Sequence, residues 1–121
     1  MTFRTAFALS GTFLFFLTAS CDRHTLATPL PEERRIVVEL RNFEFRPETI
    51  EVEKAELIGF ELTSADIRHR FTVVGTNIDV DVQPGQTSVE RIRFETPGTF
   101  TILCTIAGHA KAGMVGNLIV R

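Results

Sequence analysis

The chain has 121 residues, with 13 Lys and Arg against 15 Asp and Glu, and a formal net charge of -2 at pH 7. A chain of this length is expected to form one domain, and without a basic patch it is not expected to bind nucleic acid. It contains 11 Phe but no Trp or Tyr, so an aromatic core can form without buried hydroxyl or indole groups that need hydrogen-bond partners.

Residues 1–20 are predicted to be a secretory signal peptide. They contain one positive charge, Arg4, and a mostly apolar stretch from Ala6 to Ala19. The strongly apolar part, residues 13–17, is shorter than the roughly 20 apolar residues of a membrane-spanning helix. The ending Thr18-Ala19-Ser20-Cys21 resembles the lipobox of bacterial lipoproteins, which implies that Cys21 is acylated. The protein would then be lipid-anchored outside the cytoplasm, in the periplasm or on the outer face of the cytoplasmic membrane. A plain secretory signal, with Cys21 as a free thiol, is the alternative.

Residues 21–34 are predicted to form a flexible tether between this anchor and the folded domain. They contain Pro29 and Pro31, a cluster of charges and no apolar period, and proline favours an extended chain. We interpret His24, which lies in this segment, as a solvated linker residue. The folded domain is expected over residues 35–121.

Short apolar runs with a period of two follow the tether. This period indicates half-buried strands, and Pro84-Gly85 marks a turn between two of them. Val89 lies on the opposite parity from Ile92, which predicts a β-bulge near Glu90-Arg91. No segment has a sustained helical period, so we predict an all-β sandwich or barrel of seven to eight strands. The expected strands lie near residues 36–41, 50–53, 58–62, 71–73, 78–82, 89–94, 99–104 and 115–120.

The segment between the last two predicted strands carries a metal-ligand pattern. It places one thiol, one imidazole and one thioether at the spacing Cys104-x4-His109-x4-Met114. Trigonal coordination by two His and one Cys, with a weak axial Met, is typical of a mononuclear electron-transfer copper site. The second imidazole must come from upstream, and His69 stands just before a predicted strand, where it could meet the loop. The alternatives are His24 and no second imidazole at all.

Each of these residues also has an ordinary structural explanation. A lone Cys is commonly a buried core residue, Met114 alone would be assigned to the core, and His69 alone would be an exposed residue between Arg68 and Arg70. The combined spacing favours the ligand interpretation over these. A disulfide between Cys21 and Cys104 would consume the metal thiolate, so we assign the two cysteines separate roles.

The span from Ile36 to Arg121 resembles the cupredoxins, the small blue copper proteins. The resemblance rests on the ligand pattern, on His69 and on four further segments, Asn42–Ile50, Val82–Thr87, Thr96–Phe100 and Gly113–Val120. The ligand spacings are most similar to those of rusticyanin-type members. The resemblance implies a Greek-key β-sandwich that holds one copper ion, cycling between Cu(I) and Cu(II), on His69, Cys104, His109 and Met114. It also implies an electron carrier and not an enzyme.

The resemblance implies a mode of docking as well. His109 lies among small apolar residues and is the expected exit for the electron, through an apolar patch where a redox protein docks weakly. This partner would be a cytochrome, an oxidase or a reductase, and the carrier is expected to be a monomer. Arg70, Ala107 and Phe100 stand where many cupredoxins have Asn, Pro and Tyr, so the surroundings of the Cys ligand are expected to differ.

Four rival functions use a similar fold. The binuclear copper domain of cytochrome oxidase subunit II needs two Cys in the loop, and residues 105–108 supply none. A copper carrier or sensor could use the same ligands, although the Met-rich or His-rich tracts common in metal carriers are absent. Copper enzymes that reduce nitrite or oxidise phenols need further His ligands, and the chain has only 3 His. A purely structural sandwich is the remaining alternative.

Overall fold

The computed structural model describes residues 32–121. The predicted signal peptide, Cys21, His24 and nearly all of the predicted tether lie outside the described residues. Within residues 32–121 no helix has the length and hydropathy needed to cross a membrane. The strands are β1 Glu33–Arg41, β2 Glu44–Arg46, β3 Thr49–Val52, β4 Leu57–Ser64, β5 His69–Val73, β6 Asp79–Val82, β7 Thr87–Arg93, β8 Gly98–Leu103 and β9 Val115–Val120.

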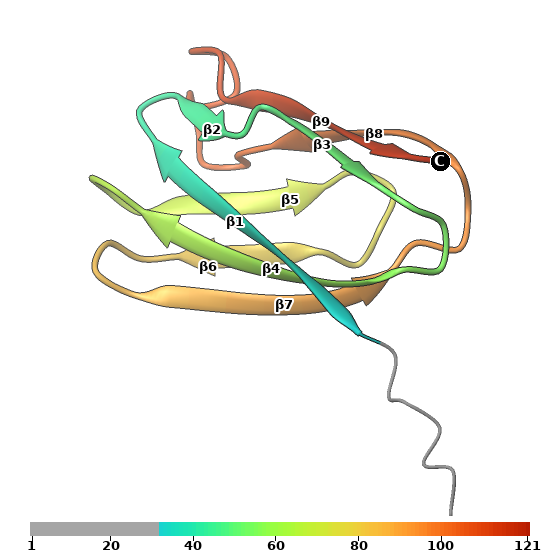
Figure 1. Cartoon of the computed structure of the whole chain (residues 1–121). Coiled ribbons are helices and arrows are strands. Elements are labelled where there is room, and N and C mark those ends of the chain that lie inside the picture. The colour runs from blue at the N-terminus through green and yellow to red at the C-terminus, as the bar shows by residue number, and fades with distance from the viewer. Residues whose placement is uncertain (1–31) are drawn as a thin grey trace, which may run out of the picture.

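The strands form two sheets that pack face to face (Figure 1). One sheet has the order β2-β1-β4-β7 and the other has the order β3-β9-β8-β5-β6. β1 pairs in parallel with β4 and β3 in parallel with β9, whereas the other pairs are antiparallel. The predicted all-β Greek-key sandwich is therefore confirmed. The additional strand is β2, whose three residues are too few for an alternating pattern to reveal.

The predicted bulge near Glu90-Arg91 is wrong. β7 pairs with β4 without interruption along its whole length of seven residues. The change of parity has another cause, because Val89 lies on the outer face of the sheet, where it is 45% exposed, whereas Ile92 packs against the core. One apolar residue on the solvent face is enough to imitate a phase change in the sequence.

Alternate residues of both sheets fill the space between them, as the pleat of a strand requires. Phe71 of β5 contacts Phe45 of β2 and Phe60 of β4, with ring centroids 5.8 and 5.4 Å apart. Each of these rings is almost fully buried, and such burial contributes roughly 1.5–3 kcal/mol for a large apolar side chain. The cluster lies beside the first residues of β5, so the strand that begins at His69 starts from a packed core.

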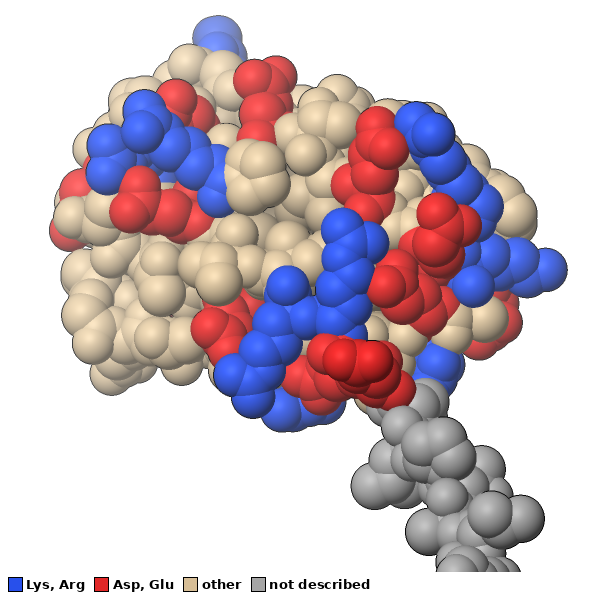
Figure 2. All heavy atoms as spheres, viewed as in Figure 1, with Lys and Arg blue, Asp and Glu red and all other residues tan. Residues whose placement is uncertain are grey.

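Ion pairs cross the outer face of the four-stranded sheet near the start of β1. Arg91 pairs with Glu33 at 2.7 Å, and Arg35 pairs with Glu61 at 3.0 Å. Figure 2 shows positive and negative side chains interspersed on this side of the molecule. Exposed pairs of this kind contribute at most about 1 kcal/mol each, so this face is polar and of mixed charge, and its pairs add little stability.

Candidate metal centre

The predicted ligands gather at one end of the sandwich, where two loops meet. His69 is the first residue of β5, Cys104 directly follows β8, and Met114 directly precedes β9. β8 and β9 stay paired as far as Leu103 and Val115, and the N–H of Cys104 donates to the carbonyl of Met114 at 3.3 Å. The two ends of the ligand loop are therefore held side by side by the sheet.

Three donor atoms converge within this end of the fold. The Nδ1 atoms of His69 and His109 lie 3.2 Å apart, and the Sγ of Cys104 lies 3.5 Å from the Nδ1 of His109. The ligand atoms of all three residues lie within 4.8 Å of one another. Bonds of about 2.0–2.3 Å from one metal ion to imidazole nitrogen and thiolate sulfur can span such separations. The donors present therefore fit a single ion.

Burial excludes water from these donors. His69 is fully buried, Cys104 is 1% exposed and His109 is 9% exposed. Met114 is also fully buried, and its N–H donates to the carbonyl of His109 at 3.1 Å. A buried imidazole pair is costly unless both rings find partners, and a metal ion shared with the thiol provides one. A thiol, two imidazoles and a thioether form a soft donor set that suits copper.

The loop between Cys104 and Met114 folds into compact turns that bring His109 inward. The N–H of His109 donates to the carbonyl of Ile106 at 3.0 Å, and the N–H of Ala112 donates to the carbonyl of Gly108 at 2.9 Å. Gly108 has a φ of 86°, in the left-handed region that glycine tolerates best. The backbone of the loop is thus fixed by its own hydrogen bonds.

Arg70 does not enter the centre through its side chain. Its backbone N–H donates to the Sγ of Cys104 at 3.3 Å, while its guanidinium pairs with Asp79 at 2.7 Å on the outer face of the sheet. The contact to sulfur is therefore independent of which side chain follows His69. The neighbouring Arg68 also points outward, and its hydrogen bond holds the pKa of Asp81 below the usual value.

Asp66 is a residue that the sequence did not reveal. Its Oδ1 lies 2.7 Å from the Nε2 of His69, on the side of the ring opposite Nδ1. Partial desolvation acts to raise the pKa of Asp66, but hydrogen bonds from His69, Ile67 and Asn42 outweigh it and lower that pKa. A carboxylate behind a metal-binding imidazole is a common way to orient the ring. The only sequence signal is an acidic residue three positions before His69, which is weak.

Phe43 is the second contact that the sequence did not predict. It lies in the turn between β1 and β2, and its ring meets the ring of His109 edge to face, with centroids 5.1 Å apart. Phe43 is 40% exposed. Its ring therefore covers part of His109 and continues to the surface.

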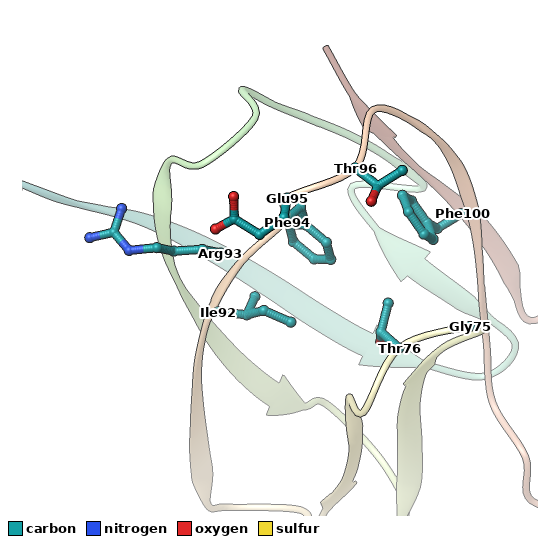
Figure 3. A pocket seen from close by; sticks show the side chains of 8 residues that line it. All are labelled: Gly75, Thr76, Ile92, Arg93, Phe94, Glu95, Thr96 and Phe100. Carbon is teal, nitrogen blue, oxygen red and sulfur yellow. The ribbon is translucent and has the colours of Figure 1, made fainter.

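A pocket of about 360 Å³ lies away from these donors, and Figure 3 shows its lining. Its walls include Thr76, Ile92, Phe94 and Phe100, and it contains no Cys or His. Gly75, which also lines it, follows the end of β5 opposite to His69. Within residues 32–121, His69, Cys104 and His109 form the only cluster of three potential metal-binding side chains, and Cys104 is the only cysteine.

The sequence matches the model of the family described as Cupredoxin-like domain over residues 7–120. The chain belongs to this family. This cupredoxin is also 37% identical over 92 residues to two proteins named cytochrome c oxidase subunit 2, both from Thermus thermophilus and the second from a specified strain of that species. The match covers 75% of this chain in both cases, and 68% and 55% of the two relatives.

Solved structures also have folds similar to that of this cupredoxin. A chain of a heme-copper terminal oxidase dimer superposes with a TM-score of 0.64 and 28% identity, over 73% of this chain and 65% of that one. Auracyanin A, a "blue" copper protein from Chloroflexus aurantiacus, superposes with a TM-score of 0.63 and 13% identity, over 74% and 100% of the two chains. The second likeness shows the fold alone. On this fold, His69, Cys104, His109 and Met114 are arranged as a copper site.

Proposed function

We propose that this cupredoxin carries single electrons on one copper ion held by His69, Cys104, His109 and Met114. The observation that supports this is the convergence of one thiol and two imidazole Nδ1 atoms, all buried, within 4.8 Å. Copper bound there would supply reversible one-electron exchange between Cu(I) and Cu(II). No catalytic step on a substrate is proposed, and the protein acts as a carrier.

The residues around the donors hold them in fixed positions. The N–H of Arg70 donates to the Sγ of Cys104 and helps to fix its position. The paired ends of β8 and β9 fix Cys104 and Met114. Since the ligands are held by strands and by a hydrogen-bonded loop, little reorganisation would accompany a change of oxidation state.

The donor count favours one copper. A binuclear centre of the kind found in oxidase subunit II needs two thiolates in this loop, and only Cys104 is present between residues 98 and 121. The relatives named cytochrome c oxidase subunit 2 support a common scaffold and a redox partner that belongs to an oxidase. They do not support the same metal centre in this chain.

The proposed docking surface surrounds His109, and its residues come from two turns. Phe43 and Val115 are 40% and 39% exposed, and Ala112 and Gly113 are exposed beside them. Lys111 adds one positive charge to this surface. A small, mainly apolar surface suits brief contact between a monomeric carrier and a cytochrome, an oxidase or a reductase.

We further propose that the chain is lipid-anchored outside the cytoplasm through Cys21. β1 starts at Glu33 and ends at Arg41, next to Asn42, whose N–H bonds Asp66 beside the metal centre. A strand of nine residues spans roughly 27–30 Å, so the tether joins the end of the sandwich opposite to His109. An anchored domain would then present its docking surface away from the membrane.

The absorption spectrum after copper loading tests the electron-transfer proposal. We expect an intense visible thiolate-to-copper band in the Cu(II) form, lost in Cys104→Ser and retained in Cys21→Ser. A colourless protein that exchanges no electrons would refute the proposal. A protein that passes copper to a chelator faster than it exchanges electrons would be a copper carrier instead. Cell fractionation tests the anchor, because Cys21→Ser should move the protein to the soluble fraction.

A further inference from the structure

We propose that the single carboxylate of Asp66 positions both imidazoles of the metal centre. It would hold His69 directly and His109 through the turn that carries Phe43. The inference rests on the proposed copper function, since it concerns how the two rings are presented to the metal. The turn at residues 65–68 would then help to orient the histidine ligands of the metal centre.

The direct arm fixes the ring of His69 and its proton. Oδ1 of Asp66 lies 2.7 Å from Nε2 of His69, and an ionised carboxylate can only accept a hydrogen bond. In the neutral ring, the proton must therefore be on Nε2. Nδ1 is left with a free lone pair, and this is the atom that lies 3.2 Å from Nδ1 of His109. Asp66 thus selects the tautomer that can bind a metal through Nδ1.

The indirect arm runs to the other histidine. Oδ2 of Asp66 accepts a hydrogen bond from the backbone N–H of Asn42 at 2.7 Å. The next residue is Phe43, whose ring packs edge to face on His109 at an interplanar angle of 72°. The β1–β2 turn is in this way tied to the residue that orients His69. Loss of the hydrogen bond at Oδ2 would therefore affect the position of the His109 ring, although Asp66 has no hydrogen bond to that ring.

Asp66 is itself held in place. Its Oδ1 also accepts from the N–H of Ile67 at 2.6 Å, and the N–H of Ala65 donates to the carbonyl of Leu40 at 2.9 Å. Three donors therefore occupy three of the roughly four acceptor positions that a carboxylate offers. Two of these donors belong to the turn of Asp66 itself or to the residue that follows it, and the third, Asn42, lies 24 residues away. A side chain fixed in this way can transmit position between the two segments, which a freely rotating surface carboxylate cannot.

Replacement by asparagine separates the two arms. Asparagine has one carbonyl oxygen and one NH2 group. With its oxygen toward His69 and Ile67 it keeps two hydrogen bonds, whereas the NH2 group then faces the N–H of Asn42, donor against donor. The opposite orientation keeps the bond from Asn42 but sets the NH2 group against the N–H of Ile67, and the NH2 group can then donate to Nε2 of His69 only if that ring moves its proton to Nδ1. The first orientation needs no such change in His69. We therefore expect Asp66→Asn to retain the direct arm and to lose the indirect one, and Asp66→Ala to lose both.

The test uses the full chain without metal, labelled with ¹⁵N, at a pH raised until the imidazole ¹⁵N shifts no longer change. Long-range ¹H–¹⁵N spectra report the tautomer of His69, and nuclear Overhauser effects report the contact between Phe43 and His109. Wild type should show the Nε2–H tautomer and the contact. Asp66→Asn should keep the tautomer and lose the contact, and Asp66→Ala should show mixed tautomers as well.

Two further variants serve as controls. Asp79→Asn makes the same change on a carboxylate that pairs with Arg70 and touches neither histidine, so both signals should stay. Phe43→Leu removes the contact but should leave the tautomer of His69 unchanged. If Asp66→Ala fails to fold, Asp66→Asn and Phe43→Leu still separate the arms. Unchanged contacts in Asp66→Asn, or mixed tautomers in Phe43→Leu, would overturn the proposal.

The copper-loaded proteins give an independent readout. Loss of the negative charge behind His69 should raise the reduction potential in Asp66→Asn by more than in Asp79→Asn, because only Asp66 is bonded to a ligand ring while Asp79 is paired with Arg70. Equal shifts in the two variants would overturn the direct arm. If wild type shows no thiolate-to-copper band while the metal-free spectra behave as expected, the electron-transfer proposal fails and the positioning role stands. If the band is present but replacement of Asp66 changes neither the tautomer of His69 nor the contact between Phe43 and His109, the positioning proposal fails and the electron-transfer proposal stands.

Discussion

Replacing Gly116 by Ala is expected to disturb the fold and the metal centre together. Gly116 is buried in β9, two residues after Met114, and the backbone of Glu48 passes directly over it. A Cβ on Gly116 would lie 2.5 Å from the carbonyl oxygen of Glu48, about 0.9 Å inside the 3.4 Å at which ordinary van der Waals contact begins. The same oxygen accepts the N–H of Asn117 at 2.9 Å, so it cannot retreat without loss of that bond.

The size of the effect follows from these two terms. Overpacking in a well-packed interior typically costs about 1–3 kcal/mol, and a lost hydrogen bond costs about 0.5–1.5 kcal/mol. Ala regains about 0.5–1 kcal/mol over Gly within a strand, so we expect Gly116→Ala to lower the free energy of unfolding by about 1–4 kcal/mol. At roughly 4–8 °C per kcal/mol for a domain of this size, Tm should fall by at least about 4 °C. Thermal unfolding of the metal-free protein, followed by circular dichroism, measures this loss.

Gly59→Ala is the matched control, because it makes the same change within a strand of the other sheet. There the three atoms nearest to a Cβ all belong to the side chain of Glu33, which is flexible and can swing away from its ion pair with Arg91. Exposed pairs contribute at most about 1 kcal/mol, and Ala regains about 0.5–1 kcal/mol over Gly within a strand. The free energy of unfolding should thus change by less than about 1 kcal/mol. Equal losses in both variants would refute the explanation by close approach at Gly116.

Three further results are expected. Ala55 has a φ of 62°, a conformation that costs a residue with a Cβ about 1–2 kcal/mol. Gly avoids this cost but loses more chain entropy on folding, so Ala55→Gly should stabilise the protein by about 0.5–1 kcal/mol. Urea unfolding measures this gain. Val115→Lys should slow electron exchange with the redox partner in stopped-flow measurements, whereas Val89→Lys, at an equally exposed position on the other sheet, should not. Copper at about 1,000 times its Kd should add about 4 kcal/mol of stability, seen as a higher Tm, in wild type and in His24→Gln but not in His69→Gln.

The sequence predicts most of the scaffold, because alternation of apolar and polar residues depends only on neighbours along one strand. Such runs predict eight of the nine strands, and only β2 is too short to produce one. The ligand loop is equally visible, since Cys104, His109 and Met114 lie close together in the sequence. His69 could be selected only through its position at a strand end, and the structure places its ring against that of His109.

The parts that sequence reasoning missed depend on contacts between distant segments. Asp66 and Phe43 belong to two different turns with no periodic pattern, and each meets the centre only because the sandwich brings its turns together at one end. The bulge predicted from Val89 was wrong because a sequence pattern shows whether a residue is apolar and does not show which face of the sheet it occupies. The position of Arg70 suggested a different environment for sulfur, yet the contact is made by a backbone N–H, which every residue except proline provides.

The attachment of the ligand loop explains how one scaffold can hold different metal centres. β8 and β9 remain paired up to the loop, so the sheet itself positions Cys104 and Met114, and the residues between them need only turn His109 inward. The length and composition of that loop can therefore change without moving the strands. We expect the number of thiolates in this loop, and not the fold, to set the number of metal ions. Metal analysis of the loaded protein should accordingly give one copper per chain, and a reproducible ratio of two would refute this reasoning.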